Sequence, residues 1–255
     1  SHPLLIPSSP EECFSMMGDA FDMAERFQTP VFVMTDLDLG MNNWMADPFK
    51  YPERPLDRGK VLTKEDLDRL GNFGRYKDVD GDGIGWRTLP STPHPAAAYF
   101  CRGSGHNEQA QYSERDDDYR RNVDRLERKF QSMREVGPAP EEHTNDEARI
   151  GFIACGTSHH AVLESMTQLR EELGIETSYL RVRSFPFARA VREFIHRHDR
   201  VYVVDQNRDG QLFSLLKLDL DAGDIARLRS IRHYGGLPID ARSVTDELLQ
   251  QEAAQ

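Results

Sequence analysis

The stretch Ile150-Gly-Phe-Ile-Ala-Cys155 opens the segment, Arg149 to Leu218, that decides the fold class of this chain. Apolar strand candidates at 150–155, 177–182 and 201–205 alternate there with helical patterns at 161–169, 187–196 and 211–217. Gly174 is placed to end the first helix. Strands that alternate with helices predict a parallel sheet covered on both faces and joined by right-handed crossovers. We therefore predict an α/β fold.

The N-terminal residues predict a strand–helix–strand unit. Leu4–Ile6 and Val31–Thr35 are the strands, and Ser9 with Glu12 forms a capping box before a helix that ends near Phe27. The predicted apolar face of this helix consists of Phe14, Met17, Phe21 and Ala24. About 36 residues are too few to cover both faces of a sheet, so we expect the chain to begin inside a domain.

Regular patterns fade from residue 40 to residue 140, where proline and glycine are frequent. This composition indicates a long excursion rather than a domain with its own sheet. Thr63–Asp66 predicts a capped helix to about Leu70, and 84–89 predicts a strand. An amphipathic helix is predicted at 114–134. Its narrow apolar stripe is expected to pack against the same chain. The stripe consists of Tyr119, Val123, Leu126 and Phe130. We expect a domain boundary at 137–146 and a frayed end at 248–255.

Composition excludes several classes of protein. Of the 255 residues, 38% are hydrophobic and 29% charged, and no apolar run approaches the roughly 20 residues of a membrane span. The net charge of −11 argues against general nucleic-acid binding, which needs a basic surface. Cys13, Cys101 and Cys155 are far apart and form no Cys-x-x-Cys pair. We predict a cytoplasmic protein in a reducing compartment, without nucleic-acid or membrane partners.

Several motifs, taken in order, resemble one family. They are Pro7–Phe14, Thr29–Trp44, Asp80–Pro90, Arg102–Asn107 and Val201–Gln211. Together they resemble the α subunit of the 2-oxoacid:ferredoxin oxidoreductases, in particular the 2-oxoglutarate type, from the first residue to about residue 240. No single motif is specific, and the weight lies in their common order.

The resemblance implies a domain organisation. Residues 1–46 are expected to be the C-terminal tail of a pyrimidine-binding α/β domain, of the kind that holds one end of thiamine diphosphate. Residues 47–147 are expected to be a linking excursion with an amphipathic helix. Residues 148–255 are expected to form a transketolase C-terminal-like α/β domain with a parallel sheet.

The resemblance also implies an activity and its partners. The family oxidatively decarboxylates a 2-oxoacid, here 2-oxoglutarate rather than pyruvate, with coenzyme A as acceptor and ferredoxin as electron acceptor. Thiamine diphosphate, magnesium and an iron–sulfur cluster would serve the whole enzyme, with the diphosphate, its metal and the cluster on a β subunit. The family's substrate-facing and cofactor-activating stretches lie upstream of this sequence. We therefore assign no catalytic residue and no bound cofactor to this chain, and we expect it to be inactive alone.

Two alternatives remain open at this stage. In the first alternative, the chain is part of another transketolase-like thiamine enzyme, which has no iron–sulfur partner. In the second, the chain is a non-catalytic assembly module that binds its partner whether or not cofactor is present.

Polar residues that follow predicted strands are candidates for cofactor binding or for a subunit interface. Asp36, Asn42 and Asn43 follow the strand at 31–35, and Asn207 and Gln211 follow the strand at 201–205. Open α/β sheets bind ligands at such carboxyl ends. The alternative for the asparagines and Gln211 is turn formation.

Arg102, His106 and Asn107 lie in a glycine-rich loop and are candidates for contact with the thiamine site or the partner subunit. We favour the alternative, in which the polar groups of this loop satisfy buried backbone.

Three further motifs invite a ligand hypothesis that we do not favour. Asp78–Gly83 resembles the start of a calcium loop, but Leu89 replaces the glutamate that position twelve requires. Gly156-Thr157-Ser158 suits a phosphate, yet without a nucleotide-binding fingerprint we expect Thr157 or Ser158 to cap the helix. His159 and His160 point apart on a helix and are expected to be a solvated pair. We predict no metal ligands.

Overall fold

The computed structural model describes residues 2–71, 73–101 and 103–254. The chain divides into two compact units, which are treated separately below. Unit 1 comprises Ser1–His2, Ala20–Val31 and Glu53–Val136, and unit 2 comprises Pro3–Asp19, Phe32–Pro52 and Gly137–Gln255. None of the helices in the described ranges combines the length and the apolar character that crossing a membrane requires.

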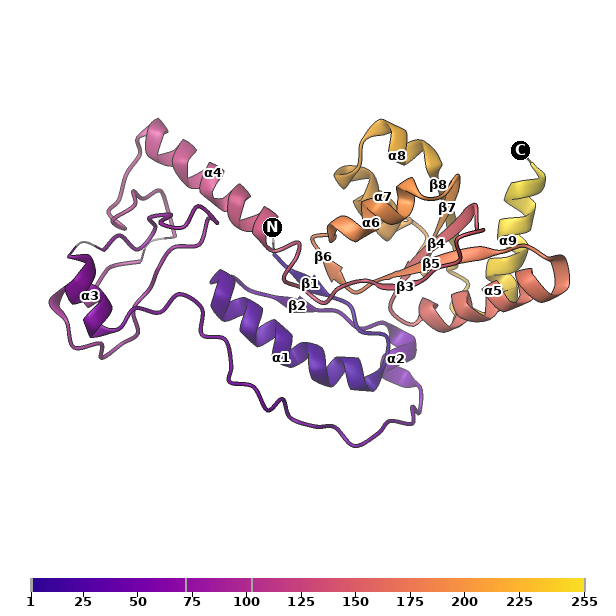
Figure 1. Ribbon diagram of the computed structural model, residues 1–255, viewed down its shortest axis with the longest axis horizontal. Coiled ribbons are helices and arrows are strands. Elements are labelled where there is room, and N and C mark those ends of the chain that lie inside the picture. Colours follow the sequence, from indigo (N-terminus) through magenta and orange to yellow (C-terminus); the bar gives the residue numbers. More distant parts are fainter. Residues whose placement is uncertain (1, 72, 102, 255) are drawn as a thin grey trace. The chain divides into compact units, whose positions relative to one another are not determined.

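A mostly parallel five-stranded sheet organises unit 2 (Figure 1). Its strand order is β3-β5-β4-β7-β8, and β5, β4, β7 and β8 are parallel to one another. The bounds are β3 Glu141–His143, β4 Ile150–Cys155, β5 Thr177–Val182, β7 Arg200–Asp205 and β8 Leu228–Arg232. The predicted α/β class and the three predicted strands are confirmed.

The edge strand β3 departs from the predicted all-parallel sheet, because it pairs antiparallel with β5. Its sequence, Glu141-Glu142-His143, carries no apolar residue, and none of the three side chains is fully buried. Such a strand suits the partly solvated edge of a sheet and not its interior.

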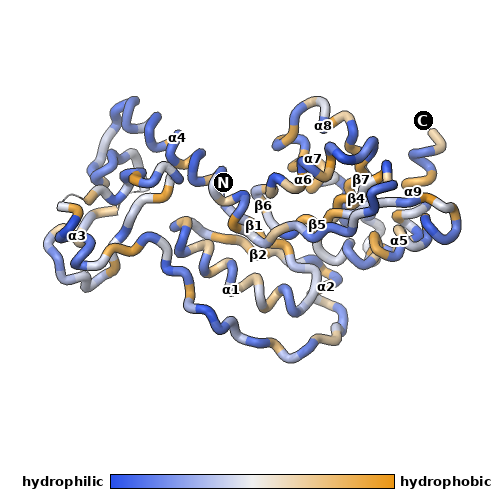
Figure 2. Tube along the Cα trace, in the orientation of Figure 1, coloured by the Kyte–Doolittle hydropathy of each residue, from blue (hydrophilic) through white to orange (hydrophobic). Residues whose placement is uncertain are grey.

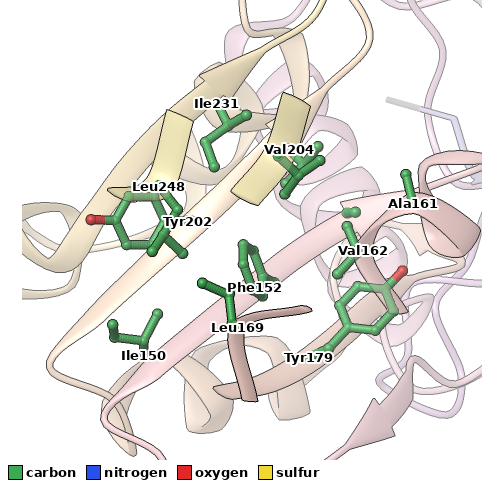
Figure 3. Packing of buried hydrophobic residues seen from close by; sticks show 12 residues of the cluster. Ile150, Phe152, Ala161, Val162, Leu169, Tyr179, Tyr202, Val204, Ile231 and Leu248 are labelled. Atoms are coloured by element: carbon green, nitrogen blue, oxygen red, sulfur yellow. The ribbon is translucent and has the colours of Figure 1, made fainter. Parts of the chain in front are cut away.

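Helices cover both faces of this sheet, as predicted. Helices α5 (Ser158–Leu173) and α9 (Ala241–Ala253) pack on one face, and α6 (Arg189–His196) and α7 (Gln211–Asp219) pack on the other. Alternation along β4 directs Phe152 to the first face and Ile153 to the second. Figure 3 shows the first cluster, in which Phe152 lies among Tyr202, Leu169 and Val162. Gly174 ends α5 in the left-handed conformation, as predicted.

The C-terminal region corrects one expectation. Residues 248–253 were expected to fray, but α9 continues to Ala253 and Leu248 is fully buried. The side chain of Asp240 accepts a hydrogen bond from the Ser243 N–H and caps the helix. Between β7 and α9, the short helix α8 (Ala222–Arg227) precedes β8.

A second, three-stranded sheet in unit 2 has the order β2-β1-β6. Strands β1 (Leu4–Leu5) and β2 (Phe32–Val33) are parallel, which confirms the predicted strand–helix–strand connection through α1 (Pro10–Phe27). Strand β6 (Ser184–Phe185) was not predicted and pairs antiparallel with β1.

The prediction of the buried face of α1 is wrong, because the buried positions are shifted by about one residue from the predicted ones. Met16, Ala20, Met23 and Phe27 are buried, whereas Met17 and Phe21 are largely exposed. Both sets have helical spacing, so periodicity alone does not choose between them.

Unit 1 contains little regular structure. Its elements beyond α1 are α3 (Lys64–Leu70), the 3₁₀ helix η1 (Pro95–Ala97) and α4 (Asp116–Ser132). Thr63 and Asp66 form the predicted capping box of α3. The strand predicted at 84–89 is wrong: within the described residues this stretch makes a single bridge, Val61 to Arg87.

Helix α4 is present as predicted, but its buried face is polar. Arg125 is buried and donates to the Gly83 carbonyl at 2.9 Å, and Lys129 donates to the Phe27 carbonyl at 3.1 Å. The predicted packing of the apolar stripe is wrong, because Tyr119, Val123 and Leu126 are exposed. Figure 2 shows the contrast between the mostly hydrophilic α4 and the hydrophobic β4 and β7.

Candidate functional site

The order of the strands in unit 2 produces a topological switch point between β4 and β7, and we use the word crevice for the polar groups at the carboxyl ends of these two strands. The chain passes from β4 to β5 on one side and later returns to β7 on the other side. Adjacent parallel strands with connections in opposite directions leave a crevice at their carboxyl ends, where open α/β proteins bind ligands. Here those ends are Gly156-Thr157-Ser158 and Asp205-Gln206-Asn207.

Asp36 lies in this crevice, although it is 121 residues from Thr157 in the sequence. One carboxylate oxygen accepts hydrogen bonds from the Thr157 N–H at 2.7 Å and from its hydroxyl at 2.8 Å. The other oxygen accepts from the Leu39 N–H and caps α2 (Leu37–Met41). A Cβ at Gly156 would lie 2.5 Å from this carboxylate, and the φ of 58° also favours glycine. Glycine thus permits the contact.

This contact corrects the predicted capping of α5. Thr157 occupies the N-cap position, but its side chain makes no cap hydrogen bond. Instead its hydroxyl donates to Asp36 and accepts a hydrogen bond from Gln206. The Gln206 amide also bonds the Ser158 hydroxyl at 3.1 Å. Sequence reasoning missed Gln206, although its place directly after a buried strand was a usable signal.

The second wall of the crevice is built around Asp205, which is buried at the end of β7. Its carboxylate accepts from the backbone N–H groups of Leu212 and Phe213 in the first turn of α7. Burial nevertheless raises the pKa of Asp205 above its ordinary value. Asn207 donates to Asp205 and accepts from the Gln211 N–H at 3.0 Å. Asn207 and Gln211 are thus part of the turn into α7, the alternative considered for them.

Cys155, the last residue of β4, is not an activated nucleophile. Burial raises the pKa of its thiol to about 12, with further contributions from the carboxylates of Asp205 and Asp36. Thiolates are stabilised by neighbouring positive charge, and this thiol faces negative charge. Among the described residues of this crevice, the carboxyl ends of β4 and β7 carry hydrogen-bonding groups, and the Cys155 thiol has no base to activate it.

Asn42 and Asn43 lie in the same unit as Asp36, outside these hydrogen bonds. The Asn42 N–H donates to the Asp38 carbonyl and ends α2, and both asparagine side chains are exposed. The next residue, Trp44, lies 5.4 Å from His160, measured between ring centroids. Contact of these asparagines with a cofactor or a partner stays a prediction.

Of the remaining candidates, His106 and Asn107 belong to unit 1. Arg102 lies outside the described residues. His106 stacks on Tyr76 with 3.7 Å between ring centroids, beside a small polar pocket of about 120 Å³. Burial lowers the pKa of His106. The Asn107 side chain accepts from the N–H groups of Gln109 and Gln111, which is the backbone role that we favoured.

The calcium-like loop is occupied by internal contacts. Asp78 accepts from the N–H groups of Gly81 and Gly83. Lys60 forms ion pairs with Asp80 at 2.6 Å and with Asp82 at 2.8 Å. A lysine therefore supplies positive charge to this loop, and the arrangement matches a solvated Asp/Gly turn.

The fold and the crevice define unit 2 as an open, mostly parallel α/β structure. No protein-family model matches the chain. It is 31% identical over 215 residues to "2-oxoacid:ferredoxin oxidoreductase 2, subunit alpha" of Aeropyrum pernix, covering 81% of this chain and 32% of that protein. It is 28% identical to "2-oxoglutarate synthase subunit KorA" of Methanothermobacter thermautotrophicus, covering 91% of this chain and 59% of that protein.

A solved structure has the same fold. The "2-oxoglutarate:ferredoxin oxidoreductase from Magnetococcus marinus with 2-oxoglutarate, coenzyme A and succinyl-CoA bound" matches with a TM-score of 0.82 and 22% identity. The match covers 98% of this chain and 42% of that chain. Over most of its length, the chain is homologous to the α subunits of 2-oxoacid:ferredoxin oxidoreductases. It spans between 32% and 59% of the length of the two curated relatives described above.

Proposed function

We propose that this chain is part of the α subunit of a 2-oxoacid:ferredoxin oxidoreductase and acts as its scaffold and subunit interface. The reaction would be the oxidative decarboxylation of 2-oxoglutarate, with coenzyme A as acyl acceptor and ferredoxin as electron acceptor. The observation that carries the proposal is the homology to α subunits over 81% and 91% of the chain. The relatives whose names include 2-oxoglutarate favour that substrate over pyruvate.

The residues present do not fit the diphosphate of thiamine diphosphate. Helix N-termini bind phosphates through free backbone N–H groups. At the start of α5, however, the Thr157 N–H already donates to Asp36, and in the first turn of α7 the N–H groups of Leu212 and Phe213 donate to Asp205. A diphosphate in this crevice would meet two carboxylates. The chain also has three cysteines, whereas an iron–sulfur cluster commonly takes four. Both groups would belong to other parts of the enzyme, and this chain alone would be inactive.

One group of exposed apolar side chains in unit 2 supports an interface. Its members lie in α1, in β2 and directly after it, in α2 and in the loop after α2, and are Met17, Phe32, Met34, Leu37, Met41 and Met45. Apolar residues gathered in neighbouring elements mark surfaces that other protein covers. The partners would be the β subunit and the upstream part of the α subunit. The domain organisation would be the one predicted from the sequence: 1–46 as a pyrimidine-domain tail, 47–147 as a linker and 148–255 as a transketolase C-terminal-like domain.

The proposal is tested by anaerobic purification from the native host through a tag on this chain. We expect an iron–sulfur-containing complex that reduces a viologen dye when 2-oxoglutarate and coenzyme A are present. A complex active only on pyruvate or a branched-chain 2-oxoacid would retain the enzyme class and reject the substrate. A partner recovered without any such activity would favour an assembly module, and recovery of the chain alone would reject the proposal.

A pair of matched variants tests the interface. Leu37 and Leu218 are both exposed leucines, with 76% and 85% of their surface accessible. Leu37 lies next to Asp36 among the exposed apolar residues, whereas Leu218 lies near the end of α7. We expect Leu37→Lys to reduce the recovered partner several-fold and Leu218→Lys to leave it unchanged. Equal recovery with both variants would place the interface elsewhere.

A further inference from the structure

Three side chains that commonly ligate metals converge at the β3 edge of the five-stranded sheet. Glu141 and His143 alternate on β3, so their side chains point to the same face. His159 lies in the first turn of α5, which packs on that face. One potential ligand atom from each residue lies within 4.8 Å of the other two, and all three residues are half-buried.

Neighbouring residues orient these three side chains. Arg181 faces Glu141 across the β3–β5 ladder and donates from its Nε to the Glu141 Oε2 at 3.1 Å. The Oε1 atom of Glu141 then faces the His143 Nε2 at 2.9 Å. The Tyr179 hydroxyl lies 3.3 Å from the His159 Nδ1, which leaves the Nε2 of His159 for another partner. Partners on the far side of each ligand are typical of metal sites.

The charge around the cluster permits a cation. Arg181 is the buried positive charge nearest to Glu141, and it is paired with both Glu12 and Glu141. Glu12 also pairs with Arg183, so two carboxylates balance two guanidinium groups before an ion arrives.

The distances are close to those of a zinc centre. Zinc bonds to His nitrogen and carboxylate oxygen are about 2.0–2.2 Å, so two ligand atoms at a tetrahedral angle are about 3.4 Å apart. The 2.9 Å between Glu141 and His143 would open by about 0.5 Å, and the widest separation, at most 4.8 Å, would close by side-chain rotation. Two imidazoles with one carboxylate suit zinc and related transition metals, whereas calcium and magnesium prefer oxygen ligands.

We propose that Glu141, His143 and His159 bind a divalent transition-metal ion of the zinc type. The three protein ligands leave a fourth coordination position for water or a further ligand. The ion joins the edge strand β3 to the start of α5. This site is independent of the oxidoreductase proposal, because it rests on these residues alone.

Calorimetric titration of the untagged, chelator-treated 255-residue chain with Zn²⁺ tests the site, and Co²⁺ absorption reports the coordination. We expect one equivalent to bind and no binding of Ca²⁺. His143→Ala and His159→Ala should each weaken binding by at least about tenfold, and Tyr179→Phe by about tenfold through the lost support of His159. His160→Ala is the matched control, because this neighbouring histidine is exposed and lies outside the cluster.

Absence of Zn²⁺ binding would overturn the proposal, as would unchanged affinity in both histidine variants or equal loss in His160→Ala. Circular dichroism of each variant establishes that it is folded. Glu141→Gln keeps the size of the side chain and removes its charge, so it tests the site even if an alanine variant unfolds. It should also weaken binding and shift the Co²⁺ spectrum, and an unchanged spectrum would reject Glu141 as a ligand.

Discussion

The two units of this chain are stabilised internally by different kinds of interaction. In unit 2, apolar clusters fill both faces of the five-stranded sheet. In unit 1, the described part of α4 turns Arg125 and Lys129 toward backbone carbonyls and leaves its apolar stripe exposed. Apolar burial stabilises in proportion to area, whereas a hydrogen bond contributes a net of about 1 kcal/mol because water competes for the same groups. We therefore expect unit 2 to be the more stable unit.

The two tryptophans allow each unit to be followed separately. Trp44 belongs to unit 2 and Trp86 to unit 1, and the chain has no third tryptophan. A Trp86→Phe background reports the unfolding of unit 2, and a Trp44→Phe background reports that of unit 1. In urea, we expect the Trp86 signal to change at the lower concentration. Coincident transitions would show instead that the two units unfold as one.

The largest effect is expected from Leu169→Ala in the core of unit 2. Leu169 is fully buried on α5, so its removal loses apolar burial and leaves a cavity. The free energy of unfolding reported by Trp44 should fall by about 3–5 kcal/mol. Leu218→Ala is the control with the same chemistry on another helix, and because Leu218 is exposed, it should change stability by less than about 0.5 kcal/mol. Similar effects at both positions would contradict the apolar-core description.

Arg181→Met should have the second-largest effect, because it tests a buried polar cluster of unit 2. Arg181 is buried and bonds Glu12 at 2.6 Å as well as Glu141. Its removal leaves Glu12 partly buried with Arg183 as its remaining cation at 2.8 Å. We expect unit 2 to lose about 3 kcal/mol in urea unfolding.

The double variant Glu12→Gln/Arg181→Met sharpens this test. If the loss in Arg181→Met comes from an uncompensated carboxylate, removing that charge should restore part of the stability. The Arg181 guanidinium holds the pKa of Glu12 at about 2, below its ordinary value of 4.5. Stability from this pair is thus present above pH 4.5 and lost as the pH falls toward 2. A double variant no more stable than Arg181→Met would show that the arginine acts mainly through packing.

The difference between an apolar core and polar contacts also explains which elements could be predicted from the sequence. Apolar runs and helical spacing predicted β4, β5, β7 and α5, because these elements face a common apolar core. Strand β3, with the sequence Glu-Glu-His, has no such pattern. Strand β8 places Leu228 and Ile231 three residues apart, which fits neither a strand nor a clear helix. In α4 the pattern predicted the helix but not its orientation, because polar contacts selected the buried face.

The candidate site was predictable only in part. The position of Asp36 after a predicted strand marked it as a candidate for cofactor binding or for a subunit interface, and that role stays a prediction. Its contact with Thr157 joins segments 121 residues apart, and no local pattern encodes that contact. The cluster of Glu141, His143 and His159 was missed for a related reason. His159 was considered with its neighbour His160, whereas its partners lie on another strand.

The smallest effect concerns the pH dependence of unit 1. Burial, with the charges of Arg125 and Arg75, lowers the pKa of Lys129 from 10.5 to about 8. Between these values the unfolded chain binds more protons than the folded chain, so the stability of unit 1 should rise as the pH increases from 8 to 10.5. Because Lys129 retains some solvent exposure, we expect the gain to be about 1–2 kcal/mol, less than the full shift implies.

Lys129→Met isolates this contribution, because cysteine and tyrosine residues also titrate in this range. The stability difference between Lys129→Met and the parent chain, measured through Trp86, should favour the variant most below pH 8 and shrink toward pH 10.5. The matched control is Lys64→Met. Lys64 is an exposed lysine of α3 whose pKa is raised by Asp68, and its substitution should show no such convergence. A pH-independent difference for Lys129→Met would mean that its ammonium group is solvated, and that unit 1 does not bury charge at this position.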